Sequence, residues 1–254
     1  MPLLPGAEPF AHDGGRTGAL VVHGFTGSPK SMRPWAEELA AAGLTVRLPR
    51  LPGHGSQWQD LAVTRWDDWY GEAERAFLEL RARCDEVVVM GLSMGGALAL
   101  RLAELHGPDV TGLVVVNPLV SSENKLLVAL PVLKTVVPWV KGVGNDIAKP
   151  DQDEGCNDRM PTKALHSLMQ ACAVVRADLG RVTQPLLLFR SSADHVVDAS
   201  SSAYVLAHVG STDVEERVLT RSYHVATLDY DAPEIVAGSL AFVRRLASTP
   251  ATET

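Results

Sequence analysis

The sequence predicts an α/β fold in which a doubly wound, mostly parallel sheet carries helices on both faces. Apolar runs of strand length alternate with stretches of helix length, which is the pattern of successive βαβ units. A serine flanked by glycines stands between one apolar run and the helix pattern that follows it. The alternation breaks only at about 119–161. We therefore expect a single domain over residues 1–254, with a small cap inserted at about 119–161.

Hydrophobic periodicity gives the expected bounds of the elements. Strands are predicted at 18–22, 44–48, 86–90, 110–116, 184–190 and 214–219. Helices are predicted at 30–42, 67–83, 94–106, 163–179, 199–208 and 232–247.

The composition excludes several classes of function. The chain has 23 basic and 30 acidic residues and a net charge of −7, which disfavours binding to nucleic acid or to an anionic membrane surface. Its three cysteines are an odd number without metal-ligand spacing, so we expect no metal site and reduced thiols in a cytoplasmic protein. The first residues lack the basic region and apolar core of a signal peptide.

The most informative motif is Gly91-Leu92-Ser93-Met94-Gly95-Gly96, which lies between a buried-strand pattern and a helix pattern. G-x-S-x-G in this context is typical of a nucleophile elbow. The two glycines that flank the serine lack the Cβ atoms that would collide in so tight a turn. A helix that simply starts with small residues is the alternative interpretation. The flanking strand and helix favour Ser93 as a nucleophile.

A serine nucleophile needs a general base and an acid that orients the base. On a fold with such an elbow, the acid and then the histidine follow the serine along the chain. Asp194 comes just after the apolar strand 184–190, and His224 follows the alternating strand 214–219. Asp198 is the alternative acid, although its sequence context resembles a helix N-cap.

The other histidines fit different roles. His195 adjoins Asp194 and would point away from it on an extended turn, and His54 fits a structural role in a tight glycine loop. A capped loop histidine is the alternative interpretation of His224. Histidines in the N-terminal tail or on predicted helices are expected in solvent: His12, His106, His166 and His208.

An oxyanion hole on such a fold uses the backbone N–H after the nucleophile and a second N–H from a loop after an early strand. His23-Gly24-Phe25-Thr26-Gly27 follows the predicted strand 18–22. Its two glycines allow conformations that a side chain would forbid. The predicted donors are the amides of Phe25 and Met94, with an ordinary glycine turn as the alternative.

Five stretches of the chain are specific in combination: His23-Gly24-Phe25-Thr26-Gly27, Leu51-Pro52-Gly53-His54-Gly55, Gly91-Leu92-Ser93-Met94-Gly95-Gly96, Asp194-His195-Val196-Val197 and Ser222-Tyr223-His224-Val225-Ala226-Thr227-Leu228-Asp229. With them the chain resembles the α/β-hydrolase superfamily, and more narrowly the bacterial monoacylglycerol lipase and carboxylesterase group, from about Pro5 to about Leu246. The resemblance implies a catalytic triad and two oxyanion donors that hydrolyse carboxylic esters without a metal or organic cofactor: Ser93, Asp194, His224, Phe25 and Met94.

The inserted segment 119–161 is strongly apolar over 126–140. A membrane-spanning helix needs about 20 apolar residues, and Pro131, Lys134 and Pro138 interrupt this run, so no stable membrane span is expected. A lid whose inner face lines an acyl pocket fits the pattern. A core segment or a dimer contact is the alternative, and we expect a monomer or a homodimer.

The predicted substrate is a small lipid or ester, and in the first place a monoacylglycerol. Each buried CH₂ of an acyl chain contributes about 0.8 kcal/mol, whereas an unpaired buried hydroxyl of the glycerol would cost about 1–3 kcal/mol. Asp158 is the predicted partner of these hydroxyls, because the resembling lipases carry an acidic residue before the proline that leads back to the main domain.

Three other functions stay open at this point. A short-to-medium-chain carboxylesterase or a thioesterase would use the same triad. A ligand-binding protein without activity is disfavoured by the intact set of serine, aspartate and histidine. The serine at the elbow also disfavours a dehalogenase or an epoxide hydrolase, which would carry aspartate there.

Overall fold

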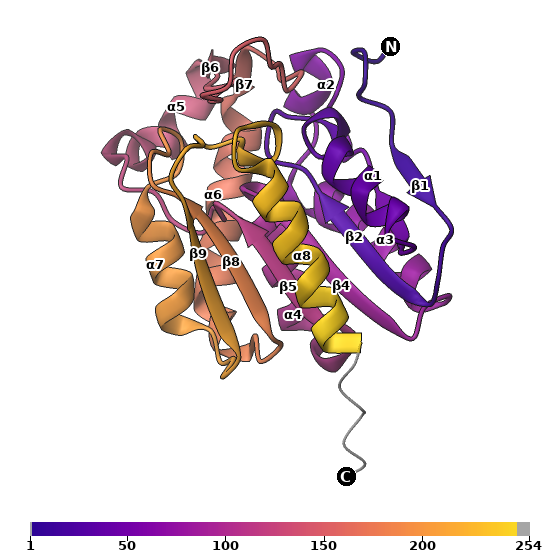
Figure 1. The fold of residues 1–254 in the computed structure, drawn as a ribbon. Helices are drawn as coiled ribbons and strands as arrows, with labels where there is room; N and C mark the ends of the chain where they lie inside the picture. The colour runs from indigo at the N-terminus through magenta and orange to yellow at the C-terminus, as the bar shows by residue number, and fades with distance from the viewer. Residues whose placement is uncertain (1, 248–254) are drawn as a thin grey trace.

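The computed structural model describes residues 2–247, and its centre is a seven-stranded sheet (Figure 1). The strand order is β1-β3-β2-β4-β5-β8-β9. Strand β1 pairs antiparallel with β3, and all other neighbours pair parallel. This topology confirms the predicted fold class. The strands are β1 Phe10–His12, β2 Thr17–Val22, β3 Thr45–Leu48, β4 Glu86–Leu92, β5 Gly112–Val116, β8 Leu186–Ser191 and β9 Val214–Leu219.

The predicted strands and helices are all present, with ends that differ by a few residues at most. The helices are α1 Arg33–Ala41, α2 Trp58–Ala62, α3 Trp66–Arg81, α4 Met94–His106, α5 Leu130–Val136, α6 Thr162–Asp178, α7 Ala199–His208 and α8 Ala232–Ala247. The sequence did not predict β1, α2 or α5. These have three, five and seven residues, too few to display a helical or strand period.

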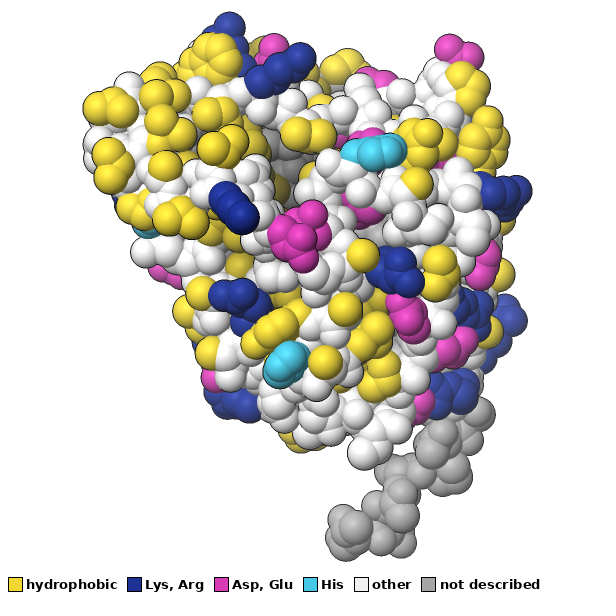
Figure 2. Space-filling model, turned by 90° about the vertical axis from the view of Figure 1, so that its left-hand side faces the viewer, with side chains coloured by type: hydrophobic (Ala, Val, Ile, Leu, Met, Phe, Trp, Pro, Cys, Tyr) yellow, Lys and Arg dark blue, Asp and Glu magenta, His cyan; other side chains and the backbone are white. Residues whose placement is uncertain are grey.

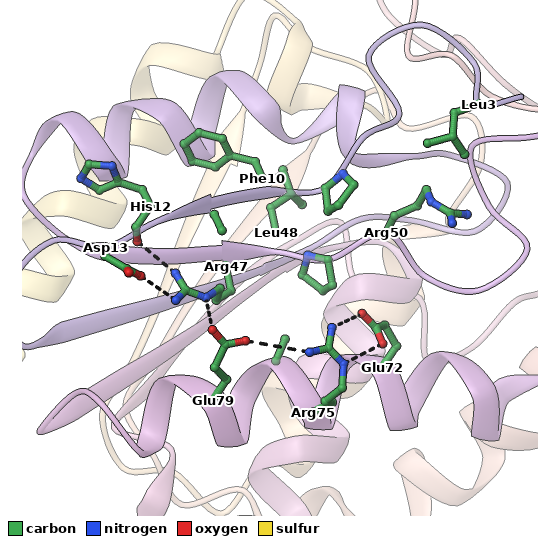
Figure 3. A pocket seen from close by; sticks show the side chains of 14 residues that line it. Leu3, Phe10, His12, Asp13, Arg47, Leu48, Arg50, Glu72, Arg75 and Glu79 are labelled. Atoms are coloured by element: carbon green, nitrogen blue, oxygen red, sulfur yellow. Dashed lines mark hydrogen bonds and ion pairs between the residues drawn. The ribbon is translucent and has the colours of Figure 1, made fainter.

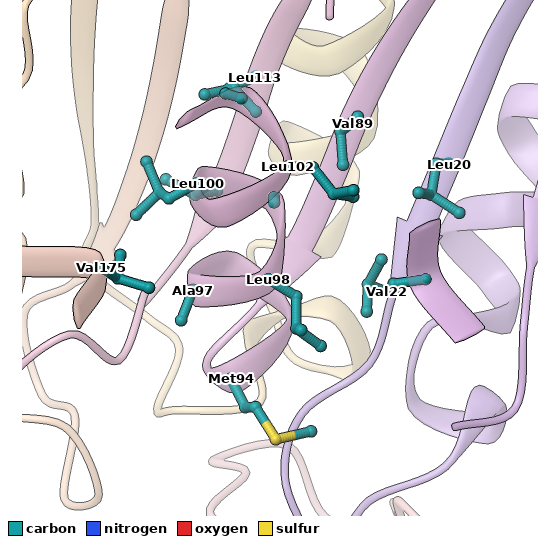
Figure 4. Packing of buried hydrophobic residues seen from close by; sticks show 14 of the residues in the cluster. Leu20, Val22, Val89, Met94, Ala97, Leu98, Leu100, Leu102, Leu113 and Val175 are labelled. Atoms are coloured by element: carbon teal, nitrogen blue, oxygen red, sulfur yellow. The ribbon is translucent and has the colours of Figure 1, made fainter. Parts of the chain in front are cut away.

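Helices cover both faces of the sheet (Figure 1). Side chains of α1 and α8 pack on one face, and side chains of α3, α4, α6 and α7 pack on the other. Helix α4 is the most deeply buried of these, and Leu98 and Leu100 are fully covered. Figure 4 shows Met94 and Leu98 on the side of this helix nearest Val22. The sheet and α4 therefore form a fixed base for the residue between β4 and α4.

The chain between β5 and α6 forms the insertion, residues 117–161. It contains a short 3₁₀ helix, η3 (Lys125–Ala129), then α5, and then a hairpin of β6 (Trp139–Lys141) with β7 (Arg159–Pro161). The guanidinium of Arg159 lies 4.3 Å from the ring centre of Trp139 and 5.8 Å from that of Trp58 on α2. These contacts hold the hairpin against the main domain.

The apolar run of the insertion faces solvent more than the sequence predicted. Leu126, Val128, Val132 and Val136 are 79%, 83%, 72% and 75% exposed. Figure 2 shows hydrophobic side chains gathered at the end of the molecule that carries α5. Within residues 2–247, no helix combines the length and the apolar character that crossing a membrane requires.

Candidate functional site

The elbow between β4 and α4 places Ser93 in a strained conformation. Its φ of 57° and ψ of −117° lie in a region that residues with a side chain rarely adopt. A Cβ atom on Gly95 would lie 2.1 Å from the carbonyl oxygen of Val22, and one on Gly91 would lie 2.2 Å from the carbonyl carbon of Gly95. Only glycine fits at either position, which explains the G-x-S-x-G pattern physically.

Asp194 and His224 meet beyond the ends of β8 and β9. The Nδ1 atom of His224 lies 2.7 Å from Oδ2 of Asp194, and both side chains are more than nine-tenths buried. The other carboxylate oxygen, Oδ1, accepts the backbone N–H groups of Val196 and Val197, each at 2.8 Å. The carboxylate is thus fixed by its own loop, and it holds the imidazole by its Nδ1 atom.

Ser93 and His224 line one cavity, of about 180 Å³. It lies between the carboxyl ends of the strands and the insertion, where open α/β sheets bind their ligands. Most of its lining is apolar, and Thr26 and Glu154 are among the few polar side chains. The apolar side chains are Phe25, Leu92, Leu119, Leu127, Val143, Met160, Leu165, Leu168, Met169, Val196 and Val225.

The loop after β2 lies directly against Ser93. A Cβ atom on Gly24 would lie 3.4 Å from Cβ of Ser93 and 3.9 Å from its Oγ atom. Phe25 lines the same cavity, and Met94 follows Ser93 at the start of α4. Both predicted oxyanion donors therefore belong to segments that lie next to Ser93.

His23 fixes the position of this loop. Its Nε2 accepts the backbone N–H of Leu51 at 3.2 Å, so Nδ1 carries the proton and donates to the carbonyl of Gly24 at 2.9 Å. Burial lowers the pKa of His23 to about 4 and holds the pKa of His54 well below its ordinary value. His54 packs in a ring cluster with His23, Phe25 and Trp69, which agrees with a structural role.

The alternative candidates lie elsewhere. The carboxylate of Asp198 accepts the N–H of Glu123 at 2.9 Å, and His195 pairs with Asp146 at 2.8 Å.

Two expectations for the histidines were wrong. His106 and His166 are partly buried, because they pair with Glu74 (2.9 Å) and Lys134 (3.0 Å), whereas His12 and His208 are exposed as predicted.

Asp158 does not lie in the cavity with Ser93. Its side chain is exposed, and its carbonyl group accepts the N–H of Gly142 in the hairpin of the insertion. The acidic side chain that does line the cavity is Glu154, which the sequence did not single out. Burial raises the pKa of Glu154, and the N–H of Asn145 and the nearby His224 partly offset this effect.

Asn117 is a further site residue that the sequence did not single out. It follows β5 with φ of 45°, and its amide Nδ2 donates to the carbonyl of His224 at 2.8 Å and to Oγ of Ser191 at 3.0 Å. Its Oδ1 accepts the N–H of Ser191 at 2.7 Å. Asn117 thereby joins the β8 and β9 ends of the site. An asparagine directly after a buried strand was the available signal.

A larger cleft, of about 620 Å³, lies at the β1 edge of the sheet, between β1, β3 and α3 (Figure 3). Five of its charged side chains pair with one another. Arg47 pairs with Asp13 at 2.6 Å and with Glu79 at 2.8 Å, and Arg75 pairs with Glu72 at 2.6 Å. Among the described residues no group of histidine, cysteine and acidic side chains could hold a metal ion.

Comparison with known proteins identifies the family. The Hydrolase_4 family, described as serine aminopeptidase, S33, matches residues 16–231. The chain belongs to this family. It is 42% identical over 241 residues to a thermostable monoacylglycerol lipase of Bacillus sp. (strain H-257), covering 95% of this chain and 96% of that protein. A carboxylesterase of Bacillus subtilis (strain 168) is 23% identical, over 94% of this chain and 97% of its own length.

Solved structures confirm that the chain is an α/β hydrolase. A structure from work on the metagenome-derived lipolytic enzymes LipS and LipT superimposes with a TM-score of 0.93 at 40% identity, covering 96% of this chain and all of that one (100%). The monoacylglycerol lipase of Paleococcus ferrophilus has a TM-score of 0.78 at 20% identity, covering 98% and 99% of the two chains, and shows the shared fold.

Proposed function

We propose that this protein hydrolyses carboxylic esters through an acyl-enzyme on Ser93, with monoacylglycerols as its preferred substrates. The observation that carries the proposal is the 2.7 Å contact of His224 with Asp194, because His224 lines the same cavity as Ser93. His224 takes the proton of Ser93 as the hydroxyl attacks the ester carbonyl, and Asp194 stabilises the imidazolium that forms. Water then hydrolyses the acyl-enzyme.

The amides of Phe25 and Met94 stabilise the tetrahedral oxyanion in this mechanism. Each such donor contributes about 2.7–4 kcal/mol to catalysis. The close approach of Gly24 to Ser93 supports this role for Phe25, the next residue. An oxyanion donor must lie within about 3 Å of the position that the substrate oxyanion will occupy.

We assign recognition of the glycerol group to Glu154 instead of Asp158. Glu154 is buried and lines the cavity together with Ser93 and His224. Its Oε1 accepts the N–H of Asn145 at 2.6 Å. A carboxylate offers about four acceptor positions, so Glu154 keeps acceptors for the two free hydroxyls of a monoacylglycerol. The apolar side chains of the same cavity suit the acyl chain.

The lipolytic relatives support this substrate class. We also propose a cytoplasmic location, in which Cys84, Cys156 and Cys172 stay reduced; all three are free thiols.

The insertion over 119–161 acts as the cap of the single catalytic domain in this proposal, since it supplies Leu119, Leu127 and Glu154 to the cavity.

A labelling experiment separates an enzyme from a ligand-binding protein. A fluorophosphonate probe should modify the wild-type protein at Ser93 and should leave Ser93→Ala unmodified. A wild-type protein that neither reacts with the probe nor turns over any ester would overturn the proposed function.

Relative rates then identify the substrate. We expect faster hydrolysis of monoacylglycerols than of di- and triacylglycerols, thioesters or short nitrophenyl esters. Comparable rates on triacylglycerol emulsions would contradict the monoacylglycerol preference. A higher rate on the short esters would favour a general carboxylesterase, and a higher rate on thioesters would favour a thioesterase.

The role of Glu154 is tested with two esters of one fatty acid, a glyceryl and a methyl ester. Glu154→Gln should lower the preference for the glyceryl ester about tenfold, because an unpaired buried hydroxyl costs about 1–3 kcal/mol. Asp158→Asn is the matched control, and its preference should equal that of the wild type. The reverse result would return the role to Asp158.

A further inference from the structure

A short segment of the insertion, Asn145–Lys149, lies against the two loops that carry Asp194 and His224; we call it the strap. Its key side chain is Asp146, which is 12% exposed. Oδ2 of Asp146 accepts the backbone N–H of His224 at 3.0 Å and that of His195 at 3.2 Å. Oδ1 lies 2.8 Å from Nδ1 of His195. One carboxylate therefore contacts both loops.

The rest of the strap is tied down as well. The carbonyl of Asp146 accepts the N–H of Val225 at 3.1 Å. In the opposite direction, Asp229 accepts the N–H groups of Ala148 at 2.7 Å and Lys149 at 3.0 Å. Two aspartates thus connect the strap and the histidine loop reciprocally, one from each side.

The backbone of His224 is held from two directions as a result. Asn117, at the end of β5, donates to its carbonyl at 2.8 Å, whereas Asp146, in the insertion, accepts its N–H at 3.0 Å. The first contact comes from the rigid sheet and the second from the inserted segment. His224 lies in the loop that follows β9, so neither a strand nor a helix fixes its backbone.

We propose that Asp146 is a positioning residue for the catalytic base, an inference that rests on the proposed esterase function. Its carboxylate fixes the backbone of His224 relative to that of His195, the residue after Asp194. It thereby sets the direction in which the imidazole of His224 faces Ser93. A displacement of about 1 Å in a reacting group can cost a hundredfold in rate. Because Asp146 belongs to the insertion, the orientation of His224 depends on where the insertion lies on the main domain.

The test compares Asp146→Ala with Asp151→Asn. Alanine at 146 removes the oxygen that accepts the N–H groups of His195 and His224, whereas asparagine could keep both contacts with its amide oxygen. Asp151 lies in the same insertion, is exposed, and has φ of 60°, a conformation that asparagine tolerates well. Its substitution controls for the loss of one negative charge near the site.

Kinetic constants are measured on a soluble nitrophenyl ester, at a temperature well below the Tm of each variant. Active sites are counted by fluorophosphonate titration taken to completion. Asp146→Ala should lower kcat per active site about ten- to a hundredfold, with KM changed less than about twofold. Asp151→Asn should match the wild type. The low-field proton resonance of the His224–Asp194 hydrogen bond should shift or broaden in Asp146→Ala alone.

Two failures can be told apart. An inactive, unlabelled wild type would remove the proposed function itself. An active wild type together with an Asp146→Ala variant of unchanged kcat and unchanged low-field resonance would overturn the positioning role, even if the Tm of that variant were lower. In that case Asp146 would only anchor the insertion.

Discussion

The carboxyl end of the sheet and the insertion above it are held together by different forces. Around the elbow the constraint is steric, since Gly91 and Gly95 have no room for a Cβ atom, and the helix that follows is buried on nearly all sides. In the insertion, Leu126 and Val128 lie mostly in solvent, and polar contacts to the main domain fix the segment. The difference indicates that packing fixes Ser93, whereas hydrogen bonds fix the insertion above it.

The polar contacts of the insertion concentrate on the site. Asp146 reaches the histidine loop, Lys30 pairs with Asp153 at 2.7 Å, and the N–H of Asn157 donates to the carbonyl of Thr26 at 3.2 Å. Each contact joins the insertion to a loop after β2 or β9. Changes in the sheet region should therefore abolish chemistry or folding, and changes in the insertion should alter rate and selectivity.

The largest effect is expected at the nucleophile. Ser93→Ala should lower kcat by about a millionfold, as loss of the nucleophile does in a well-studied triad. The fold should persist, because the missing oxygen carries the covalent step and contributes little to packing. Circular dichroism and turnover of a nitrophenyl ester check both statements. A purified variant that kept a tenth of the wild-type rate would show that Ser93 is not the nucleophile.

The acid comes next in magnitude. Asp194→Asn should lower kcat by up to about ten-thousandfold, because an amide stabilises the wrong imidazole tautomer. Asp198→Asn is the control; its carboxylate accepts the N–H of Glu123, and its rate should stay within about twofold of the wild type. A larger loss in Asp198→Asn than in Asp194→Asn would reassign the acid.

The sheet region was predictable because the chain order of an α/β sheet constrains it. Each candidate follows a strand with a clear apolar run, and parallel strands bring their carboxyl ends to one edge. The predicted bounds of β4 and α4 place Ser93 between them, and the strands before Asp194 and His224 were expected within a few residues. The catalytic roles of these residues stay predictions.

The insertion was less predictable, because its backbone follows no period. It carries several acids, and which of them is buried depends on turns at Asn145, Asp151 and Gly155, whose φ values are 54°, 60° and 67°. These turns direct Glu154 inward and leave Asp158 in solvent. The apolar run 126–140 is also more exposed than predicted. Hydrophobic side chains become buried only when the rest of the fold supplies a surface that covers them.

A pair of apolar truncations tests the difference in packing. Leu98→Ala removes a fully buried side chain from α4 (Figure 4) and should cost about 2–5 kcal/mol of unfolding free energy. Val128→Ala removes a side chain that is 83% exposed and should change that free energy by less than about 0.5 kcal/mol. Urea denaturation measures both. A destabilisation by Val128→Ala as large as that by Leu98→Ala would mean that the insertion packs in solution.

Two buried glutamates extend the comparison to electrostatics. Glu104 lies on α4 in the sheet region, and Glu154 lies in the insertion. Burial raises the pKa of both, and that of Glu104 reaches about 7 although Arg101 contacts it at 2.8 Å. The Oε1 atom of Glu104 has no hydrogen-bond partner among the described residues. We expect Glu104 to affect stability alone and Glu154 to affect selectivity.

The pH dependence of stability follows from the direction of the shift at Glu104. Below pH 4.5 its carboxyl is protonated in both the folded and the unfolded chain; between about 4.5 and 7 only the unfolded chain releases the proton, so the folded state loses relative stability as pH rises. The loss reaches at most about 3 kcal/mol above pH 7.

Glu104→Gln has no such proton, so its unfolding free energy relative to the wild type should increase by up to that amount between pH 4.5 and pH 8. Denaturation curves at both pH values measure the change, and the preference of this variant for glyceryl over methyl esters should equal that of the wild type. Parallel curves for variant and wild type would mean that Glu104 is ionised in the folded protein over the same pH range as in the unfolded chain, so that burial does not raise its pKa.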